Sequence, residues 1–175
     1  MQPIVHLSVG YLCYAAYTRL RRGERPSGVP VLVLLVGAGL PDLVDQPLAA
    51  AGIVDVGRTV GHSLFTAAIV MTIVWLIATR CDRRPLAMAF VIGYTSHIAA
   101  DVPWHVLSGD IDELGFLLWP VTEMPAYTGV KPLGTVGGVE VTTLWLEAVI
   151  FVAGIGLWWR DGKPGLETLK NAVVD

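Results

Sequence analysis

Residues 29–51 read VPVLVLLVGAGLPDLVDQPLAAA, an almost wholly apolar run with two aspartates toward its end. A helix that crosses the hydrocarbon core of a bilayer needs about 20 mostly apolar residues, so this run is long enough to span a membrane. Four more stretches are similar, and the five are expected at 3–20, 29–51, 60–79, 85–107 and 139–159. The sequence therefore predicts an all-α integral membrane bundle of about five transmembrane helices.

The composition of the 175-residue chain favours the same class and excludes others. Hydrophobic residues make up 54% of the chain and charged residues only 15%, whereas soluble domains carry about 25% charged residues. The hydrophobic content excludes a disordered chain, and the net charge of −3 excludes a nucleic-acid partner. Two cysteines are too few for a disulfide-built secreted module. The remaining class is a protein of the cell membrane, in contact with membrane lipid.

We expect one transmembrane domain over residues 1–160 and a short cytoplasmic tail at 161–175, with a long non-cytoplasmic loop at about 104–138, where prolines and glycines recur. Lys and Arg gather in cytoplasmic segments, and a five-span chain with its N-terminus outside and its C-terminus in the cytoplasm puts only Arg58 and Lys131 on the outer side. The other basic residues then face the cytoplasm: Arg19, Arg21, Arg22, Arg25, Arg80, Arg83, Arg84, Arg160, Lys163 and Lys170.

Six ionisable residues from four of these stretches fall at one depth, on the non-cytoplasmic side. A charged side chain at the bilayer centre costs about 2.5–3.5 kcal/mol even on insertion scales, so these groups are expected to face one another. Three imidazoles and three carboxylates that meet in this way can be satisfied by divalent metal. We expect one or two ions, with zinc favoured by the mixture of ligands. The predicted ligands are His6, Asp42, Asp45, His62, His97 and Asp101.

Spacing supports part of this set, and simpler interpretations remain open. His97 and Asp101 lie four residues apart and therefore share one helix face. The same pair also suits a structural hydrogen bond or a proton relay. Asp42 is a candidate helix cap, while His6 and His62 suit polar positions at the membrane interface.

Two further ionisable residues are expected beside the site. His105 continues the stripe of His97 and Asp101, but we expect Pro103 to interrupt the helix and leave His105 at the outer rim. Glu147 lies within the fifth stretch, and a carboxylate inside a membrane is a functional candidate. We expect it to support the metal ligands and not to bind the ion.

Several motifs, taken in order, resemble those of the membrane-bound metal-dependent hydrolases, the YdjM-like family, also described as LexA-regulated inner-membrane hydrolases. The motifs are His6-Leu7, LPDLVDQPL, GRTVGHSLF, SHIAAD and LLWP, and they cover residues 1 to about 120. The resemblance implies hydrolysis, with metal at the six His and Asp positions above. Many members space the acidic pair as PDxD, whereas this chain has PDxxD, which leaves open whether Asp42, Asp45 or both bind metal. The basic residue before the histidine is supplied here by Arg58.

More distantly, the order of the predicted metal ligands along the chain resembles that of the helical zinc-dependent phospholipase C and nuclease enzymes, which cleave phosphoesters.

The expected function is hydrolysis of a phosphoester or related ester, with a small-molecule or lipid ester as substrate and a lipid headgroup as the favoured source. Asp42 is the candidate general base if it is not a ligand, and Arg58 is expected to stabilise an anionic oxygen of the substrate. Two other classes fit the same residues. One is a transporter for ions, protons or metal, because buried Asp and His also mark ion pathways. The other is a structural membrane protein in which a vestigial metal site ties helices together.

Overall fold

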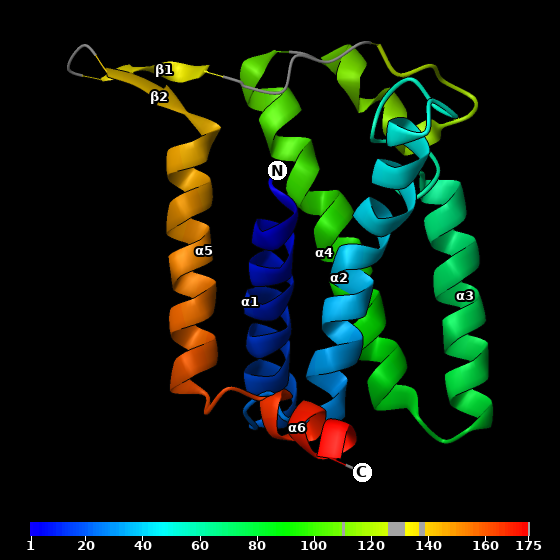
Figure 1. Cartoon of the computed structure of the whole chain (residues 1–175), viewed down its shortest axis with the longest axis vertical. Helices are drawn as coiled ribbons and strands as arrows, with labels where there is room; N and C mark the ends of the chain where they lie inside the picture. Colours follow the sequence, from blue (N-terminus) through cyan, green and yellow to red (C-terminus); the bar gives the residue numbers. More distant parts are fainter. Residues whose placement is uncertain (110, 126–131, 137–138, 175) are drawn as a thin grey trace.

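The computed structural model describes residues 1–109, 111–125, 132–136 and 139–174. Five long helices run along the long axis of the molecule and make up a bundle (Figure 1). They lie close to the five predicted stretches, so the predicted helical bundle is confirmed. The helices are α1 (Pro3–Arg22), α2 (Gly28–Ala50), α3 (Leu64–Arg80), α4 (Arg84–Ser108) and α5 (Thr143–Arg160).

Shorter elements lie at the two ends of the bundle (Figure 1). At one end a 3-10 helix, η1 (Ile111–Leu118), follows α4, and an antiparallel hairpin of β1 (Pro132–Val136) and β2 (Val139–Thr142) leads into α5. At the other end α6 (Leu166–Val174) packs against α2. The predicted tail at 161–175 thus contains a helix.

The hairpin corrects the predicted start of the fifth helical stretch. That stretch was expected to begin at residue 139, but residues 139–142 form β2 and α5 begins at Thr143. The valines there alternate with Glu140 and Thr142, which favours a strand, and the β-branched side chains of valine and threonine suit a strand better than a helix. Parts of the predicted loop, residues 126–131 with Lys131 and residues 137–138, lie outside the described residues.

Pro103 does not interrupt α4, so this prediction was wrong. The helix continues through Pro103 to Ser108 and ends at Gly109, which adopts a left-handed conformation with φ 80°. Helices in membranes tolerate proline because neighbouring groups can satisfy the backbone that it leaves unpaired. His105 therefore lies on the same helix as His97 and Asp101, and not beyond its end.

Two of the helices are long and apolar enough to cross a membrane by themselves. They are α2 and the part of α4 from Arg84 to Pro103. Helix α3 is apolar but shorter, with 17 residues. The five crossings and the orientation of the termini stay predictions.

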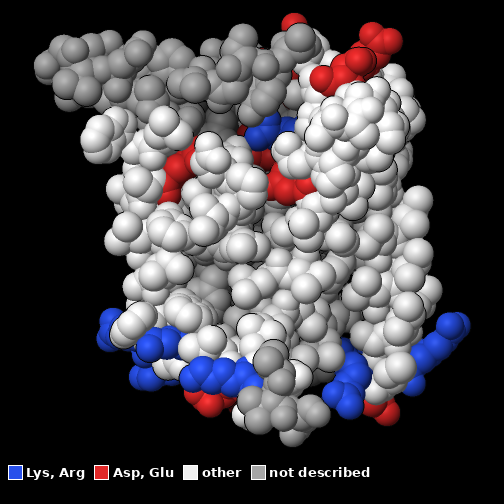
Figure 2. Space-filling model, in the orientation of Figure 1, with Lys and Arg blue, Asp and Glu red and all other residues white. Residues whose placement is uncertain are grey.

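Charge is distributed unevenly along the bundle. Basic side chains form a band at the end where α6 lies, while the waist of the molecule is almost free of charged groups (Figure 2). We call the end with this band the basic end. It holds the last turns of α1, α3 and α5 and the first turns of α2 and α4.

Glycines bring the backbones of α2 and α4 into contact. A Cβ atom at Gly93 of α4 would meet the carbonyl oxygen of Leu34 and lie 2.9 Å from the nitrogen of Ala38. A Cβ at Gly37 of α2 would lie 2.5 Å from the carbonyl oxygen of Phe90. Small residues allow such close packing of membrane helices. This contact fixes α4 against α2 one turn before His97.

Helix α1 packs between α4 and α5 and is tied to α5 at both ends. Near its start, the backbone N–H of Gln2 donates to Glu147 Oε2 at 2.9 Å. At the basic end, Tyr11 and Arg19 both donate to the carboxylate of Asp161, which follows α5. The buried Glu147 carboxylate thus accepts a hydrogen bond just before the first turn of α1 and ties that end of the helix to α5.

Candidate metal centre

The candidate centre is built around two imidazole nitrogens that face each other. The Nε2 atoms of His62 and His97 lie 3.0 Å apart. Nδ1 of His97 donates to the carbonyl of Ala38 at 2.7 Å, and Nδ1 of His62 donates to Asp45 Oδ2 at 2.7 Å. A neutral imidazole has one N–H, so each Nε2 carries a lone pair. Two lone pairs at this distance repel each other unless a cation lies between or beside them.

Asp45 positions His62 and does not face the space between the two imidazoles. Its oxygens accept from the backbone N–H groups of Thr59 at 2.7 Å, Gly61 at 2.8 Å and His62 at 3.3 Å, besides the His62 ring. The loop before α3 therefore wraps around the buried Asp45 carboxylate. Such a carboxylate fixes the tautomer and the orientation of a metal-binding imidazole.

Helix α2 supplies the acceptor that positions His97. Pro41 lies inside this helix and has no N–H to donate to the carbonyl of Gly37, four residues before it. The next carbonyl along the helix, that of Ala38, accepts from Nδ1 of His97. The close contact at Gly93 brings His97 within reach of this carbonyl.

Two carboxylates approach the paired imidazoles. Asp42 Oδ1 lies 3.7 Å from His62 Nε2 and 3.9 Å from His97 Nε2, and Asp101 Oδ2 lies 3.6 Å from His62 Nε2. In a tetrahedral zinc site with bonds of about 2.0–2.1 Å, ligand atoms lie about 3.3–3.4 Å apart. The observed separations of 3.0–3.9 Å bracket this value. The spacings of His62 Nε2 from His97, Asp42 and Asp101 therefore suit a small divalent ion such as zinc.

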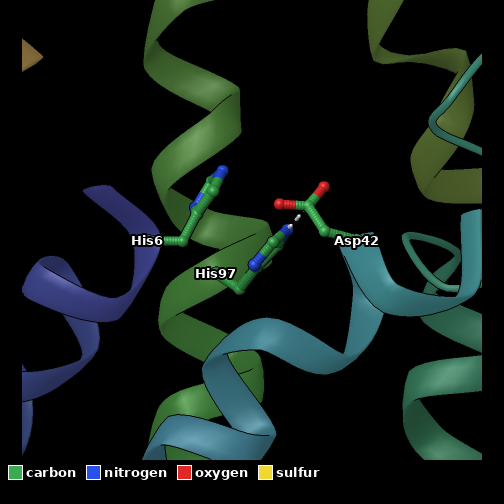
Figure 3. Close-up of side chains that lie close together, drawn as sticks. All are labelled: His6, Asp42 and His97. Atoms are coloured by element: carbon green, nitrogen blue, oxygen red, sulfur yellow. Dashed lines mark ion pairs between the residues drawn. The ribbon is translucent and has the colours of Figure 1, made fainter. Parts of the chain in front are cut away.

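His6 lies on the other side of His97. The two rings stack with centroids 3.7 Å apart, and His6, Asp42 and His97 converge from α1, α2 and α4 (Figure 3). Nε2 of His6 lies 3.4 Å from Asp101 Oδ1, but neither of its ring nitrogens has a hydrogen-bond partner among the described residues. A buried imidazole without hydrogen bonds is costly, so His6 too is a candidate metal ligand.

The charges of Asp42 and Asp101 are balanced differently. Asp101 accepts from Arg58 Nε at 2.8 Å, from Arg58 Nη2 at 3.1 Å and from the Met1 amino group at 2.9 Å. Asp42 Oδ2, in contrast, has no hydrogen-bond partner in the described part of the chain. The other oxygen of Asp42, Oδ1, faces the Nε2 atoms of both imidazoles.

Phe116 of η1 covers the centre. Its ring is fully buried and stands perpendicular to that of His62, with centroids 6.0 Å apart. The side chains of His62, His97 and Asp101 are 0% exposed, whereas that of Asp42 is 12% exposed. Of these four side chains, Asp42 is therefore the one that reaches solvent.

The structure brings five of the six predicted ligands into two groups that can hold an ion, His6, Asp42 and His97, and His62, His97 and Asp101. Asp45 lies behind His62 instead. Arg58 is buried against Asp101, and not turned toward a free space. His105 is buried away from these groups and pairs with Glu113 Oε2 at 2.8 Å.

The sequence gives no direct sign of several groups that build the centre. The carbonyl of Ala38 and the N–H groups of Thr59 and Gly61 belong to the backbone, which every residue shares. Phe116 shows no pattern that distinguishes it from other apolar residues of the chain.

The fold and the centre together define a class, a helical bundle with an apolar waist and a buried His and Asp cluster. The model of the YdjM inner membrane protein family matches residues 1–164. The chain belongs to this family and is a membrane protein, which confirms the resemblance to the YdjM-like family, while the metal-dependent hydrolysis that the resemblance implies stays a prediction. No curated protein and no solved structure matches the chain.

Proposed function

We propose that this protein is an integral membrane metal-dependent hydrolase that cleaves a phosphoester or related ester. The observation that carries the proposal is the pair of Nε2 lone pairs, 3.0 Å apart, on imidazoles whose Nδ1 hydrogens are already donated. A bound zinc ion would supply charge stabilisation and a water of lowered pKa. A lipid headgroup ester is the favoured substrate, because the centre lies in a membrane protein.

The roles of the side chains follow from their contacts. His62, His97 and Asp42 would hold one ion, with Asp101 and His6 beside it and able to hold a second. Asp42 combines exposure with an oxygen that has no hydrogen-bond partner among the described residues. If Asp101 binds the ion in place of Asp42, then Asp42 is positioned to act as the general base that takes a proton from water.

Arg58 and Asp45 act through other groups. Two nitrogens of Arg58 hold both oxygens of Asp101, and such paired contacts fix the plane of a carboxylate. Asp45 holds His62 in one tautomer. Arg58 thus orients Asp101, a candidate metal ligand. The positive charge of Arg58 would also attract an anionic oxygen of a substrate bound near Asp101.

We further propose that α1 to α5 all cross the membrane, with the basic end in the cytoplasm. The band of basic side chains at that end supports this orientation, since Lys and Arg gather on the cytoplasmic side (Figure 2). The metal centre then lies in the non-cytoplasmic half. This arrangement would admit substrate from the outer membrane interface.

The experiment uses the full chain purified in detergent. Metal content by elemental analysis and hydrolysis of a generic phosphodiester are compared for the wild type, His97→Gln and His105→Gln. His105 is the matched control, a buried histidine of the same helix that pairs with Glu113. We expect stoichiometric metal and turnover in the wild type and in the control, and loss of both in His97→Gln. Metal-free, inactive wild-type protein would refute the proposal.

A structural metal site is the second candidate. It is favoured by the burial of His62, His97 and Asp101, all with 0% side-chain exposure, because structural metal sites are closed and catalytic sites keep an open position. Stoichiometric metal that stabilises the protein, without turnover of phospholipid and nucleotide esters, would identify this second function. Ion flux in liposomes would instead identify a transporter.

A further inference from the structure

Two adjacent cavities near the basic end share no residue with the metal centre. The apolar cavity, of about 280 Å³, lies between α1, α2, α5 and α6. Its walls include Leu7, Leu32, Leu35, Phe151, Ile155 and Leu169. The arginine cavity, of about 210 Å³, is lined by Arg19, Arg25, Leu157, Arg160 and Asp161.

The apolar cavity offers hydrocarbon surface almost throughout. Its two large polar side chains are already bonded elsewhere, Tyr11 to Asp161 Oδ2 at 2.6 Å and Trp158 to the carbonyl of Pro164 at 3.1 Å. A polar ligand would therefore gain few hydrogen bonds here. The volume lies near the lower end of that of ligand pockets, about 300–1,000 Å³, so the cavity suits one slender apolar chain.

The arginine cavity has an excess of positive charge. Asp161 is its one acid, and Asp161 already pairs with Arg19 and accepts from Tyr11. Arg25 and Arg160 are exposed and have no ion-pair partner among the described residues. Two guanidinium groups that share a cavity are suited to a phosphate, which accepts paired hydrogen bonds from arginine.

The two cavities meet at one hydrogen bond. Tyr11 lines the apolar cavity, and Asp161, which accepts from it, lines the arginine cavity. Likewise Leu157 and Trp158, neighbours in α5, line one cavity each. A molecule with an anionic head and an apolar chain can therefore occupy both at once.

We propose that these cavities form a binding site for an anionic phospholipid of the surrounding bilayer. The phosphate lies between Arg25 and Arg160, and one acyl chain follows the apolar cavity along α1 and α5. Basic pockets between membrane helices recognise anionic headgroups in this way. The apolar cavity reaches Leu7, next to His6 in α1, but the site shares no residue with the metal centre and does not depend on the proposed hydrolase activity.

The first measurement uses the unaltered protein. The full chain is exchanged into nanodiscs of phosphatidylcholine with phosphatidylglycerol at a low fraction, released, and examined by native mass spectrometry. We expect one phosphatidylglycerol to be retained in preference to phosphatidylcholine. Inorganic phosphate at millimolar concentration should not displace it, because the chain in the apolar cavity contributes to binding. Equal retention of both lipids would overturn the proposal, and so would displacement by inorganic phosphate.

Variants then separate the site from general surface charge. The double variant Arg25→Gln/Arg160→Gln should weaken retention of phosphatidylglycerol by about 30-fold, the effect of two basic residues near a membrane surface. The control Arg21→Gln/Arg83→Gln removes the same charge from exposed residues of the basic end and should change retention by less than about threefold. An equal loss in both doubles would show that only net charge matters, which contradicts the proposal.

A third pair of variants tests the acyl chain. Leu169, on the wall of the apolar cavity, is 51% exposed, so Leu169→Trp can narrow the cavity without disturbing the core. Leu144→Trp is the matched control, on an α5 residue that is 50% exposed and lies outside the cavity. We expect lower retention in Leu169→Trp alone. Unchanged retention in a folded Leu169→Trp protein would exclude the chain from this cavity.

Discussion

The metal centre and the basic end accommodate polar groups in opposite ways. In the centre, side chains from α1, α2, α4 and the loop before α3 come together, and the buried rings of His62 and His97 are each fixed by one acceptor. At the basic end most charged groups are exposed, and in the described part of the chain Asp161 is the one charged side chain that links two long helices there. A buried polar group needs a fixed partner, whereas an exposed one can be satisfied by water or lipid headgroups. Substitutions in and beside the centre should therefore strongly change the stability of the fold or its affinity for metal. Substitutions at the basic end should change the stability only slightly.

The largest effect is expected where the helix backbones touch beside the centre. Gly93→Ala places a Cβ against the carbonyl of Leu34, and the forced separation of α2 and α4 should lower the free energy of unfolding by about 3 kcal/mol. Unfolding monitored by circular dichroism in mixed detergent measures this. Gly156→Ala is the control, since a Cβ there meets nothing within 4 Å. Similar stability of the two variants would contradict the packing described.

Metal removal should act on the centre and leave the basic end unchanged. With free zinc at 100 times its Kd, chelation should lower the free energy of unfolding by about 2.7 kcal/mol. Hydrogen exchange followed by mass spectrometry locates the change, which we expect around residues 57–63 and His97 and not in α6. A uniform increase in exchange along the chain would argue against a local metal site. The variant His97→Gln should not respond to chelation.

Loss of the Asp45 charge should weaken metal binding by 10–100-fold, on the order of such effects at carboxylates behind metal-binding histidines. Asp45→Asn keeps the size of the side chain, but its amide cannot accept at both positions from the surrounding N–H groups. A competition titration with a chromogenic chelator gives the affinity. Asp55→Asn, an exposed aspartate of the same loop, is the control and should change the affinity by less than about twofold.

The smallest effect is expected at the basic end. Tyr11→Phe removes the hydrogen bond to Asp161, but Asp161 keeps Arg19 as a partner. We expect a loss of about 1 kcal/mol in the free energy of unfolding, measured as for Gly93→Ala. Tyr17→Phe is the control, because no hydrogen bond of the Tyr17 hydroxyl is found among the described residues. A loss of stability as large as that of Gly93→Ala would contradict the expectation that substitutions at the basic end matter less than those beside the metal centre.

Hydropathy predicted the helices well and the local irregularities poorly. Long apolar runs specify a helix because the backbone must satisfy itself in hydrocarbon. The hydropathy of residues 139–159 predicted one continuous helix and so missed β2. The sequence GGVEVT at this point combines a glycine pair with alternating valines, a pattern typical of a hairpin. The prediction for Pro103 was also wrong, because the rule that proline ends a helix comes from helices in water.

The six His and Asp residues could be found in the sequence because ionisable groups are rare in apolar helices. Their separate roles could not. Asp42 and Asp45 are alike in sequence, three residues apart on one helix, and both were predicted as ligands. The loop at Thr59 and Gly61 distinguishes them, since its N–H groups surround Asp45 and leave Asp42 facing the imidazoles. Metal binding itself stays a prediction.

The contact between α2 and α4 has a consequence for engineering. Gly93 touches Leu34, and four residues later His97 bonds to Ala38, so two successive turns of each helix are matched in register. Sliding one helix past the other by a single turn would separate the imidazole from its carbonyl. The residue pairs 34/38 and 93/97 therefore make a short module that should transfer an oriented histidine into any designed helix pair with the same crossing.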